Sequence, residues 1–239
     1  MVKWVRDITG RFPQRPHFEP AELDQESEAT IASFLKQRHG TVAFPVTTDD
    51  LTVLLEQETA DFDLYADLSD QGDDVEGVTD FRPSSKPVVR ISRELSDDPK
   101  RENRLRTTLT HELGHVKFHS FLWALERLPL RGLPGEGSPR CKRDSILAAG
   151  LNDWMEWQAG YASGAFLMPI SRLREVVKEL REEAGTLAEL SLDTPSGWEI
   201  IQRVQASFTV SAEAARVRLL KCGYVVEQMS SASLFDIAT

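Results

Sequence analysis

Two histidines and a glutamate stand at the spacing of a metal site near the middle of the chain. They are His111, Glu112 and His115, in the run His-Glu-Leu-Gly-His. Residues four apart lie on one face of a helix, so both imidazoles can bind one metal ion. Glu112 lies one step round the helix, where its carboxylate can serve as the general base for water activated by that ion. The motif predicts metal-assisted hydrolysis. The alternative is a pair of surface histidines with no ligand.

A catalytic zinc ion needs a third protein ligand and one open position. A third histidine just downstream of the motif is absent, because residues 118–122 read Phe-His-Ser-Phe-Leu. Glu156 is the better candidate, since it is the only carboxylate after Asp153 in a predicted helix at 152–168, and its neighbours are tryptophan and methionine. A buried carboxylate is costly unless it is paired or bound to a metal. The sequence therefore predicts Glu156 as the third ligand.

His119 continues the spacing of the motif by one more turn. Three successive turns of one helix diverge from a common point, so His119 is not expected to bind the same ion. It is predicted to be a packed histidine or one that supports a ligand from behind. Gly114, inside the motif, costs about 1 kcal/mol of helix stability relative to alanine. A small residue here indicates that a neighbouring strand or the substrate approaches closely.

Apolar spacing, together with the residues that begin and end helices, predicts the elements that position these side chains. Helices are expected at 21–39, after a cap at Thr47 or Thr48, from Asp98 through His119, and at 152–168, 170–183, 198–206 and 211–222; strands are expected at 62–68, 75–81 and 87–91. The strands indicate a small antiparallel or mixed sheet. Residues 131–141 are rich in glycine and proline and predict an irregular loop. The expected fold class is α+β, with a metal-binding domain at 1–184 and a helical subdomain at 185–239.

The bulk composition narrows the class of protein. The net charge of −10 argues against a protein that coats nucleic acid, because phosphate binding depends on lysine and arginine. No apolar run approaches the roughly 20 residues needed to span a bilayer, and the first residues lack the apolar segment of a signal peptide. With only two cysteines, a structural disulfide is not expected. We expect a cytoplasmic protein with no membrane partner.

Two stretches of the sequence resemble the ImmA/IrrE family of zinc metallopeptidases. The first runs from Arg106 to His119 and contains the His-Glu-Leu-Gly-His motif. The second begins Glu156-Trp157-Gln158-Ala159 and runs on to Phe166-Leu167-Met168-Pro169. Gly160 departs from the Asn or Asp that is usual in the family, at a position that is not a ligand. The resemblance extends over about 60–230, with no room for an added ligand-sensing domain.

This resemblance implies a zincin-like fold with two metal-binding helices, zinc as the cofactor, and Glu156 as the third ligand. It also implies a substrate. Family members typically cleave a helix-turn-helix repressor, often after DNA damage or a mobile-element signal. Within the family, the chain resembles the CapP-type peptidases that are paired with CapH repressors in anti-phage operons. The resemblance therefore implies an endopeptidase that switches on a stress, DNA-damage or anti-phage operon by destroying its repressor.

Cys141 lies between the two predicted metal-binding helices, in the run Pro-Arg-Cys-Lys-Arg. Thiolate is a strong zinc ligand, and the neighbouring basic residues favour the thiolate. As an inhibitory fourth ligand, Cys141 would displace the catalytic water; the alternative is a free loop thiol. Pro-Arg-Cys is similar to the inhibitory segment of matrix metalloproteinase propeptides, and the CapP-type resemblance implies the same switch, released by nucleic acid. Cys222 is predicted to be a small packed residue.

Single-stranded DNA as the activator would need a local basic patch. Such a patch could be formed by Arg101, Arg104 and Arg106 together with the basic residues around Cys141, with Trp123 as a platform on which bases stack. The alternative is that these residues lie on solvated helix faces.

Two other functions stay open. One is a DNA-binding regulator whose helices at 198–222 use Arg203, Arg216, Arg218 and Lys221, and the other is a catalytically idle zinc scaffold. Tyr161 is a candidate for stabilising the oxyanion.

Overall fold

The computed structural model describes residues 2–72, 74–83, 85–125, 153–183, 185 and 190–227, and the backbone of 140–142. The chain divides into two compact units, with the division between Ile170 and Ser171. The fold class is α+β, as the sequence predicts. None of the helices in these ranges combines the length and the apolar character that crossing a membrane requires.

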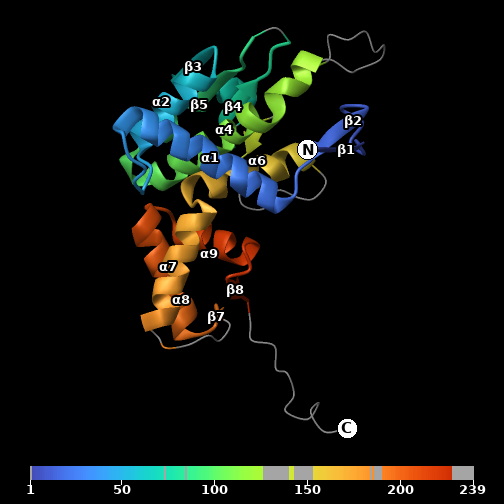
Figure 1. Ribbon diagram of the computed structural model, residues 1–239. Coiled ribbons are helices and arrows are strands. Elements are labelled where there is room, and N and C mark those ends of the chain that lie inside the picture. The colour runs from blue at the N-terminus through green and yellow to red at the C-terminus, as the bar shows by residue number, and fades with distance from the viewer. Residues whose placement is uncertain are drawn as a thin grey trace, which may run out of the picture. The chain divides into compact units, whose positions relative to one another are not determined.

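The first unit contains the sheet and the longest helices (Figure 1). Its helices are α1 (Pro20–His39), α2 (Thr48–Glu58), α3 (Arg93–Ser96), α4 (Glu102–Leu125) and α6 (Trp154–Leu167), with short 3-10 turns η1 (Ser69–Gln71) and η2 (Pro99–Arg101). Its strands are β1 (Lys3–Arg6), β2 (Gln14–His17), β3 (Asp61–Ala66), β4 (Val75–Asp80), β5 (Val88–Ser92) and β6 (Arg140–Lys142). The hairpin β1–β2 and the short helix α3 have no counterpart in the sequence prediction.

The larger sheet has the strand order β3-β5-β4-β6. β3 and β5 are parallel, whereas β4 runs antiparallel to both β5 and β6, so the predicted sheet is of the mixed kind. Residues 140–142 form β6, and this end of the predicted loop at 131–141 is therefore a strand; residues 131–139 lie outside the described part. β4 is buried along nearly its whole length and lies between β5 and β6, next to α4.

The helix caps explain where the main helices begin. Thr47 caps α2 and accepts a hydrogen bond from the backbone N–H of Asp50, whose carboxylate accepts one from Thr47 in return. Asp98 caps the turn η2, which leads into α4. Asp153 caps α6 through the N–H of Met155. These caps agree with the predicted helix starts to within two or three residues.

The packing of α4 against α6 is the main contact of the first unit, and α1 packs on α6 in turn (Figure 1). The face of α6 toward its neighbours is rich in small side chains, among them Ala159, Ala162 and Ser163, all buried. Small residues let two helix backbones approach closely. The hydroxyl groups of Thr110 on α4 and Ser163 on α6 lie 2.8 Å apart and hydrogen bond across this contact.

The second unit is helical, with two pairs of residues forming a minimal parallel sheet. Its elements are α7 (Ile170–Glu183), β7 (Leu190–Ser191), α8 (Pro195–Phe208), α9 (Ala212–Lys221) and β8 (Val225–Val226). α7 is amphipathic and buries Leu173, Val176, Val177 and Leu180. These contacts group α7 with the second unit, whereas the sequence expectation counts residues up to 184 with the first.

Candidate metal centre

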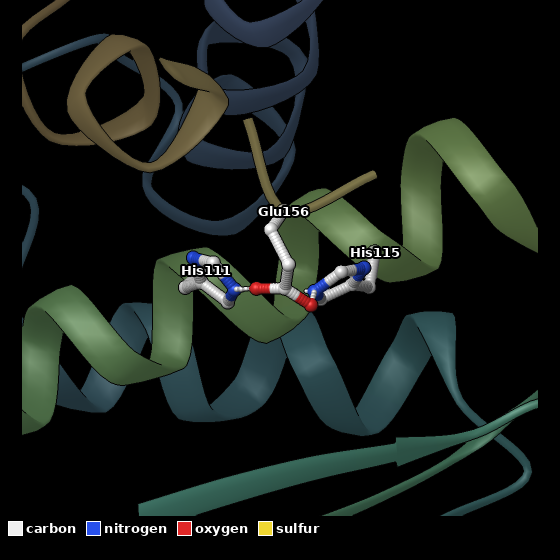
Figure 2. Close-up of side chains that lie close together, drawn as sticks. All are labelled: His111, His115 and Glu156. Carbon is white, nitrogen blue, oxygen red and sulfur yellow. Dashed lines mark hydrogen bonds and ion pairs between the residues drawn. The ribbon is translucent and has the colours of Figure 1, made fainter. Parts of the chain in front are cut away.

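The predicted ligands His111, His115 and Glu156 lie together. Figure 2 shows the Glu156 carboxylate between the two imidazoles, with one oxygen directed toward each. The Nε2 atom of His111 lies 3.0 Å from Oε2 of Glu156, and the Nε2 atom of His115 lies 3.3 Å from Oε1. The two Nε2 atoms are 3.1 Å apart. Both imidazoles are fully buried, and the carboxylate is 13% exposed. This group of donor atoms could hold a metal ion.

The separations between the donor atoms suit a small divalent ion. Ligands at about 2.0–2.1 Å from a tetrahedral zinc ion lie about 3.3 Å from one another. The three separations above, 3.0, 3.1 and 3.3 Å, need little adjustment to reach that value. Two neutral imidazoles and one carboxylate are also a donor set that zinc accepts. The residues present therefore fit the predicted ion.

Gly114 explains how α6 comes close enough to bring Glu156 to the histidines. A methyl group on Gly114 would lie 2.9 Å from the Cα atom of Ala159 and 3.1 Å from its carbonyl oxygen. Backbone at that distance cannot give way, so only glycine fits at this position. The sequence argument expects a strand or the substrate against Gly114; the structure places helix α6 there instead.

Glu112, the predicted general base, faces β4 rather than the other helices. Its Oε2 atom accepts a 2.6 Å hydrogen bond from the hydroxyl of Thr79, and the side chain is fully buried. The Cα atom of Gly77 leaves room for the other oxygen, because a methyl group on Gly77 would lie 2.6 Å from Oε1 of Glu112. That oxygen has no hydrogen-bond partner among the described residues. β4 thus holds one carboxylate oxygen by a hydrogen bond, and the other lies against Gly77 without a hydrogen-bond partner among the described residues.

The pKa values of Glu112, Glu156 and His115 are shifted in different ways by burial and by neighbouring groups. Burial raises the pKa of Glu112, and the nearby histidines and Thr79 counter this only in part. Burial alone would raise the pKa of Glu156 too, but the charge of His115 and the hydrogen bonds from both imidazoles hold it well below its usual range. Burial alone would lower the pKa of His115, yet the Glu156 carboxylate raises it. Glu156 is therefore ionised, whereas Glu112 is the carboxylate that holds a proton more readily.

His119 does not belong to the ligand group and lies behind it. Its Nδ1 atom is 3.1 Å from Nδ1 of His115, and its Nε2 atom is 3.1 Å from Oε1 of Gln158. Burial, and then the charge of His115, keep the pKa of His119 well below the ordinary value for histidine. His119 is thus both packed in the core and in contact with the predicted ligand His115.

Aromatic rings border the site on the side of β4. The ring of Phe81, just after β4, is edge-on to His115 with the ring centroids 6.4 Å apart. Trp123 of α4 stacks on Phe81 with the centroids 3.8 Å apart, and Phe12 meets Trp123 edge-on. Phe81 therefore places apolar surface beside the imidazole of His115, and Trp123 and Phe12 extend the row of rings beyond it. The indole of Trp123, a predicted platform for nucleic-acid bases, already stacks on a ring of the protein itself.

The backbone of Cys141 lies in β6, opposite Gly77 of β4. Gly77 is the residue against which Glu112 packs, so Cys141 occupies the strand position next to the predicted general base. The side chain of Cys141 lies outside the described part of the structure, and its binding to the metal stays a prediction. Cys222, at the end of α9, is only partly buried.

Several other predicted functional residues are engaged elsewhere in the structure. The hydroxyl of Tyr161 donates to the carboxylate of Asp24 on α1, which leaves it poorly suited to stabilise an oxyanion. Arg101 and Arg104 both pair with the buried carboxylate of Glu76. Arg106 is buried and donates to the carbonyl of Val46. None of these three arginines projects freely into solvent as a phosphate contact would.

The cations predicted for a DNA-binding regulator are also engaged within the second unit. Arg203 pairs with Glu183 and Glu199. Arg216 pairs with Glu213 and Glu227. Arg218 is 2% exposed, and burial lowers the pKa of Lys221. These arrangements favour a packing role for α8 and α9.

Sequence reasoning misses four residues that the structure brings to the site: Gly77, Thr79, Phe81 and Pro16. Glycine inside a strand pattern commonly marks close approach of another group, so Gly77 carries a detectable signal. Thr79 lies two residues further along the strand, on the same face. Phe81 and Pro16 carry no such signal, because only the folded chain brings them near α4 and α6.

A comparison with protein-family models finds no model that matches the chain. A comparison with curated proteins likewise finds no similar protein.

Proposed function

We propose that this protein is a zinc-dependent endopeptidase with a zincin-like site, of the kind that the ImmA/IrrE resemblance implies. The observation that carries the proposal is the convergence of His111, His115 and Glu156 beside a buried fourth group, Glu112. A structural metal site has no need of a carboxylate that is buried, unsatisfied at one oxygen and not a ligand. A hydrolytic site does need one, as a general base.

The chemistry divides among named side chains. Zinc, when bound, would supply a Lewis acid that activates water and polarises the scissile carbonyl. His111, His115 and Glu156 would hold the ion. Glu112 would accept a proton from the attacking water at Oε1, as the water oxygen bonds to the scissile carbonyl carbon, and would later return that proton to the leaving amine; its raised pKa suits both transfers. Thr79 holds Oε2 so that Oε1 keeps its direction.

The substrate class comes from the resemblance: a helix-turn-helix repressor of a stress, DNA-damage or anti-phage operon. A direct test is incubation of the purified, zinc-loaded protein with a helix-turn-helix protein encoded beside it, followed by mass spectrometry of the products. We expect one or a few cuts. Glu112→Gln should abolish these cuts while zinc content and folding persist. Glu56→Gln, which changes an exposed carboxylate, should cleave the substrate at the rate of the unmodified protein.

The same experiment separates the endopeptidase from the other two candidate functions. An idle zinc scaffold would yield no cuts with either variant or with the unmodified protein. A DNA-binding regulator would bind duplex DNA through α8 and α9, and substitution of Arg203 or Arg216 would weaken that binding. Cutting that survives Glu112→Gln would contradict the assignment of the general base.

We further propose that Cys141 holds the fourth zinc position until single-stranded DNA releases it. The backbone pairing of Cys141 with Gly77, beside Glu112, supports the position of the cysteine; single-stranded DNA as the signal comes from the resemblance alone. Cys141→Ser should raise basal cleavage and remove the need for single-stranded DNA. If basal cleavage and the zinc–sulfur signal in X-ray absorption are both unchanged, Cys141 is a free thiol.

A further inference from the structure

A line of buried polar groups runs from a metal ligand to the N-terminal hairpin. It consists of His115, His119, Gln158 and the carbonyl of Pro16, and is called here the His115–Pro16 relay. Successive atoms lie 3.1, 3.1 and 3.2 Å apart. All four residues are buried. Because water has little access to them, each hydrogen must lie between its donor and its acceptor.

The carbonyl of Pro16, at the end of the relay away from the metal position, determines which atom donates in each of its hydrogen bonds. The carbonyl of Pro16 can only accept, so the amide nitrogen of Gln158 must face it and donate. The amide oxygen then faces His119, and it too can only accept. The Nε2 atom of His119 must therefore carry a proton.

A neutral imidazole carries one N–H, so Nδ1 of His119 is left as an acceptor. His119 is fully buried, and its two polar contacts are a ring nitrogen and an amide oxygen, neither of which is an anion that would stabilise a charged ring. Nδ1 of His115 must then donate to it. That assignment uses Nδ1 of His115 as the donor and leaves its Nε2 atom, which faces Glu156 and His111, as the atom that a metal ion at this position would bind.

The end of the relay is held in place by the hairpin. β1 pairs with β2, and Pro16 lies opposite Trp4. Between the two strands, the carboxylate of Asp7 accepts from the indole N–H of Trp154, and Arg11 pairs with Asp153 at the start of α6. These contacts connect the hairpin to the same turns of α6 that carry Glu156 and Gln158.

We propose that His119 and Gln158 are positioning residues, which use the Pro16 carbonyl to keep Nδ1 of His115 as a hydrogen-bond donor and its Nε2 atom directed to the metal position. This rests on metal binding by His111, His115 and Glu156, and not on peptidase activity. Partners of this kind behind a ligand histidine commonly change metal affinity by about 10- to 100-fold when they are removed. The hairpin β1–β2 then belongs to the metal centre.

The first test is nitrogen-15 NMR of the histidine rings, in both metal-free and zinc-loaded protein. We expect a proton on Nδ1 of His115 in both forms. His119 should carry its proton on Nε2 alone, with a scalar coupling across the bond between the two Nδ1 atoms. A proton on Nδ1 of His119 overturns the proposal. The metal-free measurement decides the matter even if zinc does not bind, so failure of the relay and failure of the proposed function are distinguishable.

The second test measures zinc affinity by competition with a chelator. His119→Leu removes the acceptor for His115 and should raise the zinc dissociation constant by about 10- to 100-fold. His119→Asn places an oxygen near the position of Nδ1 and should restore most of the affinity. Equal affinities for these two variants contradict the proposal. Gln158→Met removes the acceptor for His119 without touching His115, and provides the same measurement if His119→Leu does not fold.

Discussion

Gly114 of α4 lies directly against the backbone of Ala159 of α6, and this contact sets the separation between the two helices that carry the metal ligands. A single added methyl group at Gly114 would lie within 3.1 Å of both the Cα atom and the carbonyl oxygen of Ala159. The two histidines flank Gly114 on α4, and Glu156 precedes Ala159 by one turn. Any increase in the helix separation therefore moves Glu156 away from the imidazoles.

Gly114→Ala should destabilise the protein by about 1–3 kcal/mol, the usual cost of overpacking. In an isolated helix the same change would stabilise by about 1 kcal/mol, so the sign of the effect reports the packing. Urea unfolding of the metal-free protein measures it. Ala159→Gly should not rescue the variant, because the clash is with backbone atoms. An unfolding midpoint at or above that of the unmodified protein would mean that the helices are further apart.

Thr79→Val should lower the rate of cleavage by about tenfold or more, because it removes a hydrogen bond to the Glu112 carboxylate while conserving shape. Zinc affinity should not change, since Thr79 contacts no ligand. Thr79→Ser keeps the hydroxyl and serves as the matched control. Equal rates for the valine and serine variants would remove Thr79 from the catalytic arrangement.

Zinc should stabilise the folded protein, because the ligand group exists only in the folded state. At a free zinc concentration 100 times the dissociation constant, the gain is about 2.7 kcal/mol. Treatment with a chelator should therefore lower the melting temperature. Glu156→Gln should remove most of the difference between the zinc-loaded and metal-free forms, whereas Glu179→Gln, an exposed carboxylate on α7, should preserve it. If zinc raised the melting temperature equally in both variants, Glu156 would be excluded as a ligand.

Asp7→Asn should destabilise the hairpin–α6 contact in a way that depends on pH. Burial alone would raise the pKa of Asp7, but hydrogen bonds from Thr9, Phe12 and Trp154 lower it below its ordinary value. A carboxylate with a lowered folded-state pKa stabilises above its unfolded pKa, near 3.9, and loses that contribution as the pH falls through the folded pKa. At pH 7 the free energy of unfolding of the unmodified protein should exceed that of the variant by about 1–3 kcal/mol.

The difference in free energy of unfolding between the unmodified protein and Asp7→Asn should shrink steadily below about pH 4, where the Asp7 carboxylate takes up a proton. Thermal unfolding across this pH range measures it. Asp61→Asn, which changes an exposed carboxylate on β3, is the control. A constant difference between Asp7→Asn and the unmodified protein at every pH would mean that charge plays no part.

Whether a feature of the site can be predicted from the sequence depends on how far apart in the chain the interacting residues lie. His111, Glu112 and His115 share one helix, and four-residue spacing alone puts the two imidazoles on one face. The caps at Thr47, Asp98 and Asp153 are equally local. Local geometry and apolar periodicity determine such features, and for this reason the sequence by itself predicts the main helices, the three sheet strands and the α+β class.

The partners of those residues come from distant parts of the chain. Glu156 follows His115 by a long stretch of sequence, and its role as a ligand is predicted from burial and resemblance rather than from spacing. Thr79 and Gly77 reach Glu112 only because β4 lies against α4, and Pro16 reaches Gln158 only because the hairpin closes on α6. The occupant of the space beside Gly114 was equally undetermined. Packing between distant segments decides these contacts, because the free energy that selects them comes from burial and hydrogen bonding in the assembled unit rather than from local backbone preference.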